Sequence, residues 1–238
     1  MLYRLAFSTL LAITALQGLN GLPFGLDFGK KDRQCTTFQG SITDRNDVWR
    51  AEVDKENLFE KNDNGVRLKL DAPGQYETQK NDAENYNFNT KVGSGPTFTF
   101  IPQIQYGKVS ATIQAPEAPG SVTALIFKST SGDEIDYELL SGPDEAQTNY
   151  YWGKKVETGV NGDIEKTDVS SRPRKYTIDW TPDYIKWSID DELIRTVTKD
   201  ETDGKFPENP SQIQIGLWDG SKEAGTARWA HGPIDVSI

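Results

Sequence analysis

The chain is built from short runs in which apolar and polar residues alternate, separated by turn-forming residues. The alternation is clear at 97–101, 108–115, 176–180 and 212–218. A period of two is typical of a strand with one face in a core and one face in solvent. Residues 122–127 form a continuous apolar run, as expected of a strand buried on both faces. No window of a dozen residues fits a helical period better, so the chain is predicted to be all-β.

Turn signals recur between these runs. Clusters rich in Asn, Asp, Gly, Pro or Ser occupy 62–65, 72–74 and 219–221, and Asp190–Asp191 separates two strand-like runs. Two polar residues between such runs indicate a β-hairpin. Many short strands joined by frequent turns favour two antiparallel sheets packed as a sandwich.

The N-terminal segment has a different character from the rest of the chain. Arg4 precedes a nearly apolar run at 5–16, which is too short to span a bilayer and has the length of the apolar part of a secretory signal. We predict a signal peptide over residues 1–20, a linker over 21–34 and one domain over 35–238. The protein is then secreted, to the extracellular space or a cell wall, without a membrane span. The alternative for this run is a buried amphipathic helix.

Rare residue types exclude several classes of site. One Cys, Cys35, allows no disulfide within the chain and no zinc site made of cysteines, and one His, His231, allows no cluster of histidines. Glycine-rich nucleotide-binding motifs and the nucleophile-elbow motif are absent from the sequence. The net charge of −10 makes a nucleic acid a poor partner, because phosphate binding needs a basic surface. We therefore expect no cofactor, no metal and no nucleic acid, and we expect a monomer.

One acidic segment carries candidate chemistry. Glu134, Asp136 and Glu138 alternate with an isoleucine and a tyrosine. Side chains of a strand point to alternate faces, so the three carboxyl groups share one face. Neighbouring carboxylates repel one another, so a folded protein keeps them together where they are solvated or useful. The plain alternative is a solvated strand face in a chain with 36 acidic residues.

Paired carboxyl groups are the machinery of retaining glycoside hydrolysis. One ionised carboxylate attacks the anomeric carbon, and a protonated one donates to the leaving oxygen. A third acid between them can hydrogen-bond the nucleophile and hold the charges apart, so that one pKa rises. Four residues of strand advance the chain by about 13 Å, whereas retaining chemistry needs carboxyl groups about 5–5.5 Å apart. The two glutamates must therefore lean together on a strongly concave sheet.

Several ordered motifs resemble glycoside hydrolase family 16. The run Ser131–Leu140 resembles the catalytic strand of that family, and 176–183, continuing through 186–190, resembles a later hairpin. Residues 147–151 and 225–230 look most like the fungal Crh branch, whose members are cell-wall transglycosylases that link chitin to β-glucan. The resemblance covers roughly residues 35 to 232.

The resemblance implies a fold and a set of roles. The fold would be a concanavalin-like β-jelly-roll sandwich, with the substrate across its concave face. Glu134 would be the nucleophile, Asp136 its helper and Glu138 the acid/base. Sugar rings have apolar faces that stack on aromatic side chains and hydroxyl edges that need amide partners. The residues expected to contact the polysaccharide or oligosaccharide substrate are Trp218, Asn149, Tyr150 and Trp229.

Three other functions remain open from the sequence. The first is an endo-β-1,3(1,4)-glucan hydrolase, which is less favoured because laminarinase-like members of the family carry an extra residue, E-x-D-x-x-E. The second is a carbohydrate-binding, lectin-like wall protein without turnover, which has no need for both Glu134 and Glu138. The third is a secreted effector or structural wall protein that uses the fold alone.

Overall fold

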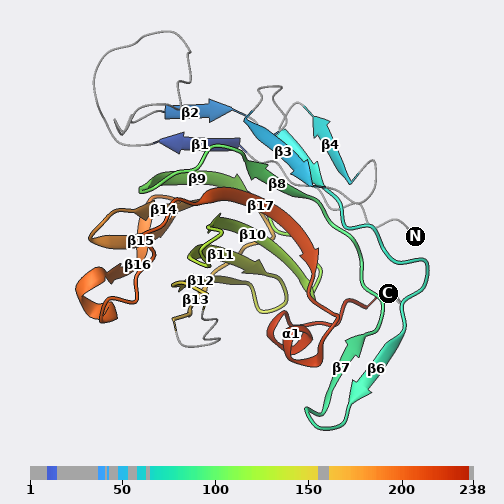
Figure 1. Cartoon of the computed structure of the whole chain (residues 1–238). Coiled ribbons are helices and arrows are strands. Elements are labelled where there is room, and N and C mark those ends of the chain that lie inside the picture. The colour runs from blue at the N-terminus through green and yellow to red at the C-terminus, as the bar shows by residue number, and fades with distance from the viewer. Residues whose placement is uncertain are drawn as a thin grey trace.

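The structure is a computed structural model that describes residues 10–14, 37–40, 42, 48–52, 58–62, 65–154 and 161–235. Cys35 and the predicted linker lie outside the described residues. Within the described part, two large antiparallel sheets are layered over one another, and their long strands are visibly curved (Figure 1). The all-β, two-sheet prediction is confirmed.

The first sheet, called the cleft sheet below, contains the acidic segment. Within the described residues it has seven strands in the order β13–β12–β11–β10–β17–β8–β3, all antiparallel to their neighbours. Its strands are β3 (Trp49–Glu52), β8 (Thr97–Phe100), β10 (Ser121–Lys128), β11 (Glu134–Leu140), β12 (Glu145–Tyr151), β13 (Asp163–Lys166) and β17 (Gln212–Asp219). The acidic strand β11 therefore lies inside the sheet, between β10 and β12.

The second sheet, called the back sheet, has six strands in the order β16–β15–β14–β9–β1–β2 within the described residues. Its strands are β1 (Leu10–Thr14), β2 (Thr37–Gly40), β9 (Gly107–Ile113), β14 (Arg174–Trp180), β15 (Tyr184–Ile189) and β16 (Glu192–Thr198). Strand β1 falls inside the predicted signal peptide and pairs with β9 and β2. The leader stays a prediction.

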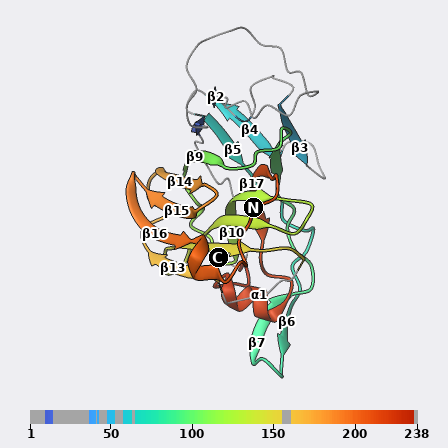
Figure 2. The same cartoon turned by 60° about the vertical axis from the view of Figure 1, so that its left-hand side comes forward.

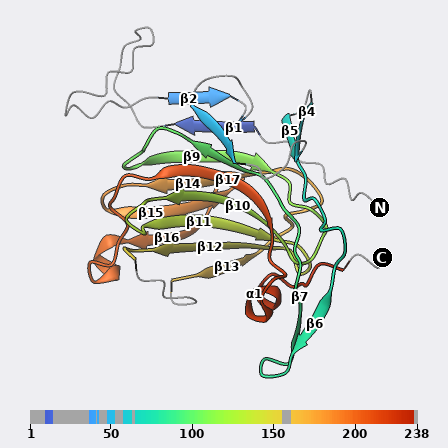
Figure 3. The ribbon, with the colours of Figure 1, turned by 45° about the vertical axis from the view of Figure 1, so that its right-hand side comes forward.

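Smaller elements lie at the ends of the sheets. They are the hairpins β4 (Phe59–Asn62) with β5 (Gly65–Leu68) and β6 (Thr78–Asn81) with β7 (Tyr86–Asn89), a 3₁₀ helix at Lys199–Thr202 and the helix α1 (Ala224–Trp229). Figures 2 and 3 show α1 beside the β6–β7 hairpin, close to the end of β17. The sequence did not predict α1, because six residues are too few to show a helical period.

Aromatic side chains fill the space between the two sheets. Tyr137 of β11 meets Tyr176 of β14 edge to face, with ring centroids 5.4 Å apart. Phe127 of β10 meets Trp180 of β14 at 5.5 Å. These four rings are buried, and contacts of this kind add to the stability that burial itself provides. The alternation predicted for β11 is therefore real, since the inner face packs into the core.

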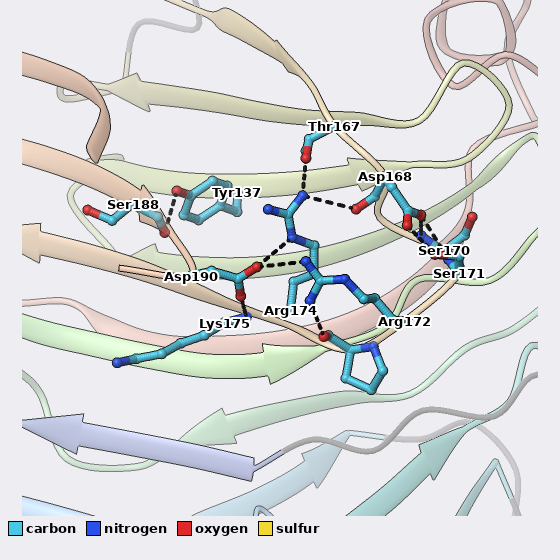
Figure 4. Close-up of polar contacts among 11 residues, drawn as sticks. Tyr137, Thr167, Asp168, Ser170, Ser171, Arg172, Arg174, Lys175, Ser188 and Asp190 are labelled. Carbon is cyan, nitrogen blue, oxygen red and sulfur yellow. Dashed lines mark hydrogen bonds and ion pairs between the residues drawn. The ribbon is translucent and has the colours of Figure 1, made fainter. Parts of the chain in front are cut away.

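The predicted hairpin at Asp190–Asp191 is confirmed. Both aspartates have positive φ, 51° and 68°, which suits a tight turn between twisted strands. The Asp190 carboxylate accepts hydrogen bonds from Arg174 Nε at 2.8 Å, from Arg172 at 3.1 Å and from the backbone N–H of Lys175 at 2.9 Å (Figure 4). Although burial raises it, the pKa of Asp190 lies below its ordinary value because of these hydrogen bonds. The turn between β15 and β16 is thereby fixed to β14.

Candidate active site

The three carboxyl groups of the acidic segment lie on the outer face of β11, as predicted. Asp136 is directly opposite Asn149 of β12, and Glu138 is opposite Gln147. Glu134 stands at the first position of the strand. Two amide side chains thus line the same face beside the carboxyl groups.

The backbone before Glu134 is fixed by a buried carboxylate. Asp133 accepts hydrogen bonds from the N–H of Gly153 at 2.8 Å, of Glu208 at 2.8 Å and of Asn209 at 2.9 Å. Burial raises the pKa of Asp133, but the backbone donors outweigh it and hold the pKa below its ordinary value. Gly132 has φ of +100°, and a Cβ there would lie 2.2 Å from a backbone oxygen of Gly153, so only glycine fits. The start of the strand is therefore tightly held.

Glu134 has a cationic partner. Lys128 ends strand β10 directly opposite Glu134, and its ammonium group forms an ion pair with the Glu134 carboxylate. The glutamate side chain is mostly buried, whereas the lysine is about half exposed. The lysine therefore places one positive charge beside the first carboxyl group of the row.

Asp136 is the most enclosed of the three acids. Its exposed fraction is 2%, and its Oδ1 is buried without a hydrogen-bond partner within the described residues. Burial above all, and then the charges of Glu138 and Glu134, raise the pKa of Asp136 well above its ordinary value. A buried carboxyl group between two others is most stable when protonated, and in that form it carries an O–H donor.

Glu138 occupies the opposite end of the row. Burial and the charge of Glu134 raise the pKa of Glu138 to about 7. Within the described residues no cation forms an ion pair with it. Glu138 is therefore an acid that can both donate and accept a proton near neutral pH.

A cleft of about 650 Å³ opens beside Glu138. Its walls come from β11, β12, β13, β17 and α1, and no other carboxyl group of the row reaches it. The lining residues are Glu138, Gln147, Thr148, Asn149, Tyr151, Gly162, Asp163, Ile164, Trp218, Gly225, Thr226 and Trp229. Trp218, Trp229 and Asn149 thus share a cleft with Glu138, and their contact with a sugar stays a prediction.

The two tryptophans form an aromatic wall. Trp218 comes from β17 and Trp229 from α1, and their rings stack with centroids 5.8 Å apart at an interplanar angle of 18°. Trp218 is 36% exposed. The Trp229 indole N–H donates to Oε1 of Gln147 at 2.8 Å. This wall offers flat apolar surface next to hydrogen-bonding groups, the combination that sugars require.

The expectation for Tyr150 is corrected by the structure. Its side chain is 7% exposed and belongs to the core cluster, because it follows Asn149 on a strand and so points to the opposite face. Tyr151 lies on the cleft face, opposite Glu134, and its hydroxyl accepts a hydrogen bond from Asn149 at 2.8 Å. The period of two along β12 is the signal that identifies Tyr151, with Gln147 and Asn149.

In the part of the chain that the structure describes, no three His, Cys, Asp or Glu side chains are arranged to hold a metal ion. Among the same residues, no helix has both the length and the apolar character needed to cross a membrane.

Comparisons with known proteins agree with this geometry. The family model described as glycosyl hydrolases family 16 matches residues 45–233. "Congo red hypersensitive protein 2" of Saccharomyces cerevisiae is 36% identical over 155 residues, 61% of this chain and 33% of that protein. "Crh-like protein 4" of Botryotinia fuckeliana is 38% identical over 154 residues, 62% of this chain and 41% of that protein. The chain therefore spans about a third to two fifths of the length of these curated relatives.

A solved structure gives the same result. A "Crh5 transglycosylase in complex with NAG" superposes with a TM-score of 0.64 at 28% identity, covering 79% of this chain and 72% of that one. The antiparallel sandwich is thus the jelly-roll of that family, as expected. The sheets, the carboxylate row and the extent of these matches together show that this chain belongs to the glycosyl hydrolases of family 16, in the branch of the Crh-like proteins.

Proposed function

We propose that the protein is a retaining glycosidase that acts chiefly as a transglycosylase on cell-wall chitin and β-glucan. One observation carries the proposal: on one strand face, Glu134 is paired with Lys128, while the pKa of Glu138 is raised to about 7. An ionised carboxylate and a protonated carboxyl group on the same face are what retaining chemistry needs. A lectin-like protein without turnover does not require two carboxyl groups with such different surroundings.

In the first step, the Glu134 carboxylate attacks the anomeric carbon of the donor sugar. The bond to the leaving oxygen breaks, and that oxygen takes the proton of Glu138, so a covalent glycosyl-enzyme forms. Asp136, in its protonated form, donates a hydrogen bond within the row and avoids a third negative charge. In the second step, Glu138 takes the proton of an acceptor hydroxyl, whose oxygen displaces Glu134 and retains the configuration.

The choice between transfer and hydrolysis depends on what reaches the glycosyl-enzyme first. A sugar hydroxyl held against the wall of Trp218 and Trp229 competes with water, and an apolar wall excludes water. The relatives named above support transfer, since one is a Crh5 transglycosylase in complex with NAG. NAG is the repeating unit of chitin, which supports chitin as the donor.

The proposal also covers where the protein works. A cell-wall substrate requires export, which agrees with the predicted signal peptide. The mass of protein recovered from culture medium should correspond to a chain that begins near residue 21. Its elution on size exclusion should match a monomer.

A transfer assay tests the activity. Purified mature protein is mixed with a chitin-oligosaccharide donor and a fluorescent β-1,3-glucan oligosaccharide acceptor, beside the Glu134→Gln variant. We expect labelled hybrid product from the wild type alone. Shortened donor without labelled product would make the protein a hydrolase. Folded protein that binds both oligosaccharides and forms neither product would refute the enzymatic proposal.

A further inference from the structure

We propose that Glu145 is a positioning residue, which holds the aromatic wall in place through Gln147 and so sets the affinity for the sugar next to Glu138. The proposal deepens the function given above and rests on it. It concerns a residue that does not line the cleft, since Glu145 is absent from its walls.

Glu145 is a buried carboxylate with three donors. Its side chain is 4% exposed. Its Oε1 forms an ion pair with Lys166, while its Oε2 receives His231 Nε2 at 3.1 Å and Gln147 Nε2 at 3.0 Å. Burial raises the pKa of Glu145, but the hydrogen bonds from Lys166, His231 and Gln147 hold it below its ordinary value. The group is therefore a fixed anion at neutral pH.

A fixed anion determines which way the Gln147 amide points. A carboxylate only accepts hydrogen bonds, so the NH₂ group of Gln147 must face Glu145. The amide oxygen then faces the opposite way, where it accepts the Trp229 indole N–H at 2.8 Å. In the reverse orientation, two donors would meet at Trp229 and two acceptors at Glu145. Glu145 thus selects the one orientation in which Gln147 can hold the indole.

The indole needs this support because its helix is short. Helix α1 has six residues and ends at Trp229, and so brief a helix has little stability of its own. The next residues tie it to the sheet through the same carboxylate, because His231 also contacts Glu145. The backbone N–H of Gly120, which directly precedes β10, donates to the Ala230 carbonyl at 2.8 Å. Trp229 is thereby kept parallel to Trp218.

The position of the wall formed by Trp218 and Trp229 indicates which sugar ring of the substrate it contacts. The cleft contains Glu138 but not Glu134. Glu138 transfers the proton to the leaving oxygen and from the acceptor hydroxyl, so a ring beside it belongs to the leaving group or the acceptor. A loosened wall should therefore weaken acceptor binding more than it slows the chemical steps.

Indole exchange tests the positioning directly. The Trp229 indole resonance is identified among the six tryptophans by comparison with Trp229→Phe, and its hydrogen exchange with water is measured by ¹⁵N NMR without sugar. We expect Glu145→Ala to speed this exchange at least tenfold, and Glu145→Gln to speed it less, since either end of the new amide can face Gln147. Lys175→Gln, which removes a lysine paired with Asp191 and has no contact with Glu145, should leave the exchange unchanged.

Kinetics then separate positioning from folding. In the transfer assay, we expect the Glu145 variants to raise the KM for acceptor about tenfold with kcat within a factor of two, and Lys175→Gln to match the wild type. Unchanged indole exchange in either folded Glu145 variant would overturn the proposal, as would a loss in kcat without a change in KM. If Glu145→Ala does not fold, Glu145→Gln, which keeps the size of the side chain, decides the matter. Inactive wild type with faster exchange in the variants would refute the proposed function but uphold the positioning.

Discussion

Glu134 and Glu138 are the same side chain on the same face of one strand, yet their surroundings differ. Glu134 stands at the start of β11, opposite Lys128, and forms an ion pair with it. Glu138 lies opposite Ala124 and Gln147, neither of which carries charge. Burial and the negative charge of Glu134 raise the pKa of Glu138 to about 7.

The difference teaches how a symmetrical pair of acids acquires two roles. Three carboxyl groups in a row cannot all be ionised at low cost. One lysine on the neighbouring strand places a positive charge beside Glu134, and the charge of Glu134 raises the pKa of Glu138 at the other end of the row. In the proposed mechanism, strand register thus assigns the nucleophile and the acid.

The largest effect should come from replacing each glutamate in turn, with two kinds of donor. A general acid contributes on the order of 10²–10⁴ to the rate, so Glu138→Gln should lose about that much on an oligosaccharide. An aryl glycoside has a phenolate leaving group that needs no proton. On this donor, the initial burst of aryl release by Glu138→Gln should be far less affected. Glu134→Gln should fail on both donors, because the bond to the anomeric carbon cannot form. Equal losses of the two variants on the aryl donor would break the assignment.

The second effect concerns stability, and its sign follows from the raised pKa. Folded Glu138 holds its proton up to about pH 7, whereas its ordinary pKa is 4.5. The folded state therefore binds more protons in this window, and the free energy of unfolding falls as pH rises through it. Glu138→Gln removes this cost, so it should raise the unfolding free energy by about 3 kcal/mol at pH 8 and by little near pH 4.

Denaturant titrations at the two pH values measure this change. Glu192→Gln serves as a control, because it removes the same charge from an exposed position at the start of β16. The control should change stability little at either pH. A Glu138→Gln variant that is no more stable than the control at pH 8 would contradict the raised pKa.

The third effect is a shift in the pH profile. The proposed mechanism requires the acid form of Glu138 for bond cleavage, so kcat/KM of the wild type should fall as pH rises through about 7. The charge of Lys128 lowers the pKa of Glu138. Lys128→Met should therefore move the alkaline limb to higher pH. Lys175→Met, which removes an exposed lysine paired with Asp191, should leave the limb in place, and a limb that moves equally in both variants would refute the role of Lys128.

Much of this site could be predicted from local pattern. A period of two placed Glu134, Asp136 and Glu138 on one face, and the same period, applied along β12, would have exchanged Tyr150 for Tyr151. The pairing of Lys128 with Glu134 could also have been predicted, because the two residues flank a five-residue connection between two strands. The resemblance supplied Trp218 and Trp229, but local spacing did not.

The rest depends on contacts between distant parts of the chain. Gln147 and Trp229 are 82 residues apart, and Asp133 accepts from a backbone 75 residues away. Their meeting is fixed by the packing of whole strands, which no local periodicity encodes. The raised pKa of Asp136 likewise follows from burial that only the assembled sheets provide.

The smallest effect should come from a change on the inner face of β11, which packs into the core behind both glutamates. The Tyr137 hydroxyl donates to the Ser188 carbonyl of β15 at 3.1 Å, across the sandwich (Figure 4). Tyr137→Phe keeps the ring and its contact with Tyr176 but leaves that carbonyl one donor short, so it should cost about 1 kcal/mol of unfolding free energy. Because both ends of β11 rest on the same inner face, kcat/KM should change less than twofold and its pH limb should not move. A shifted alkaline limb would mean that the core, as well as Lys128, causes the difference between Glu134 and Glu138.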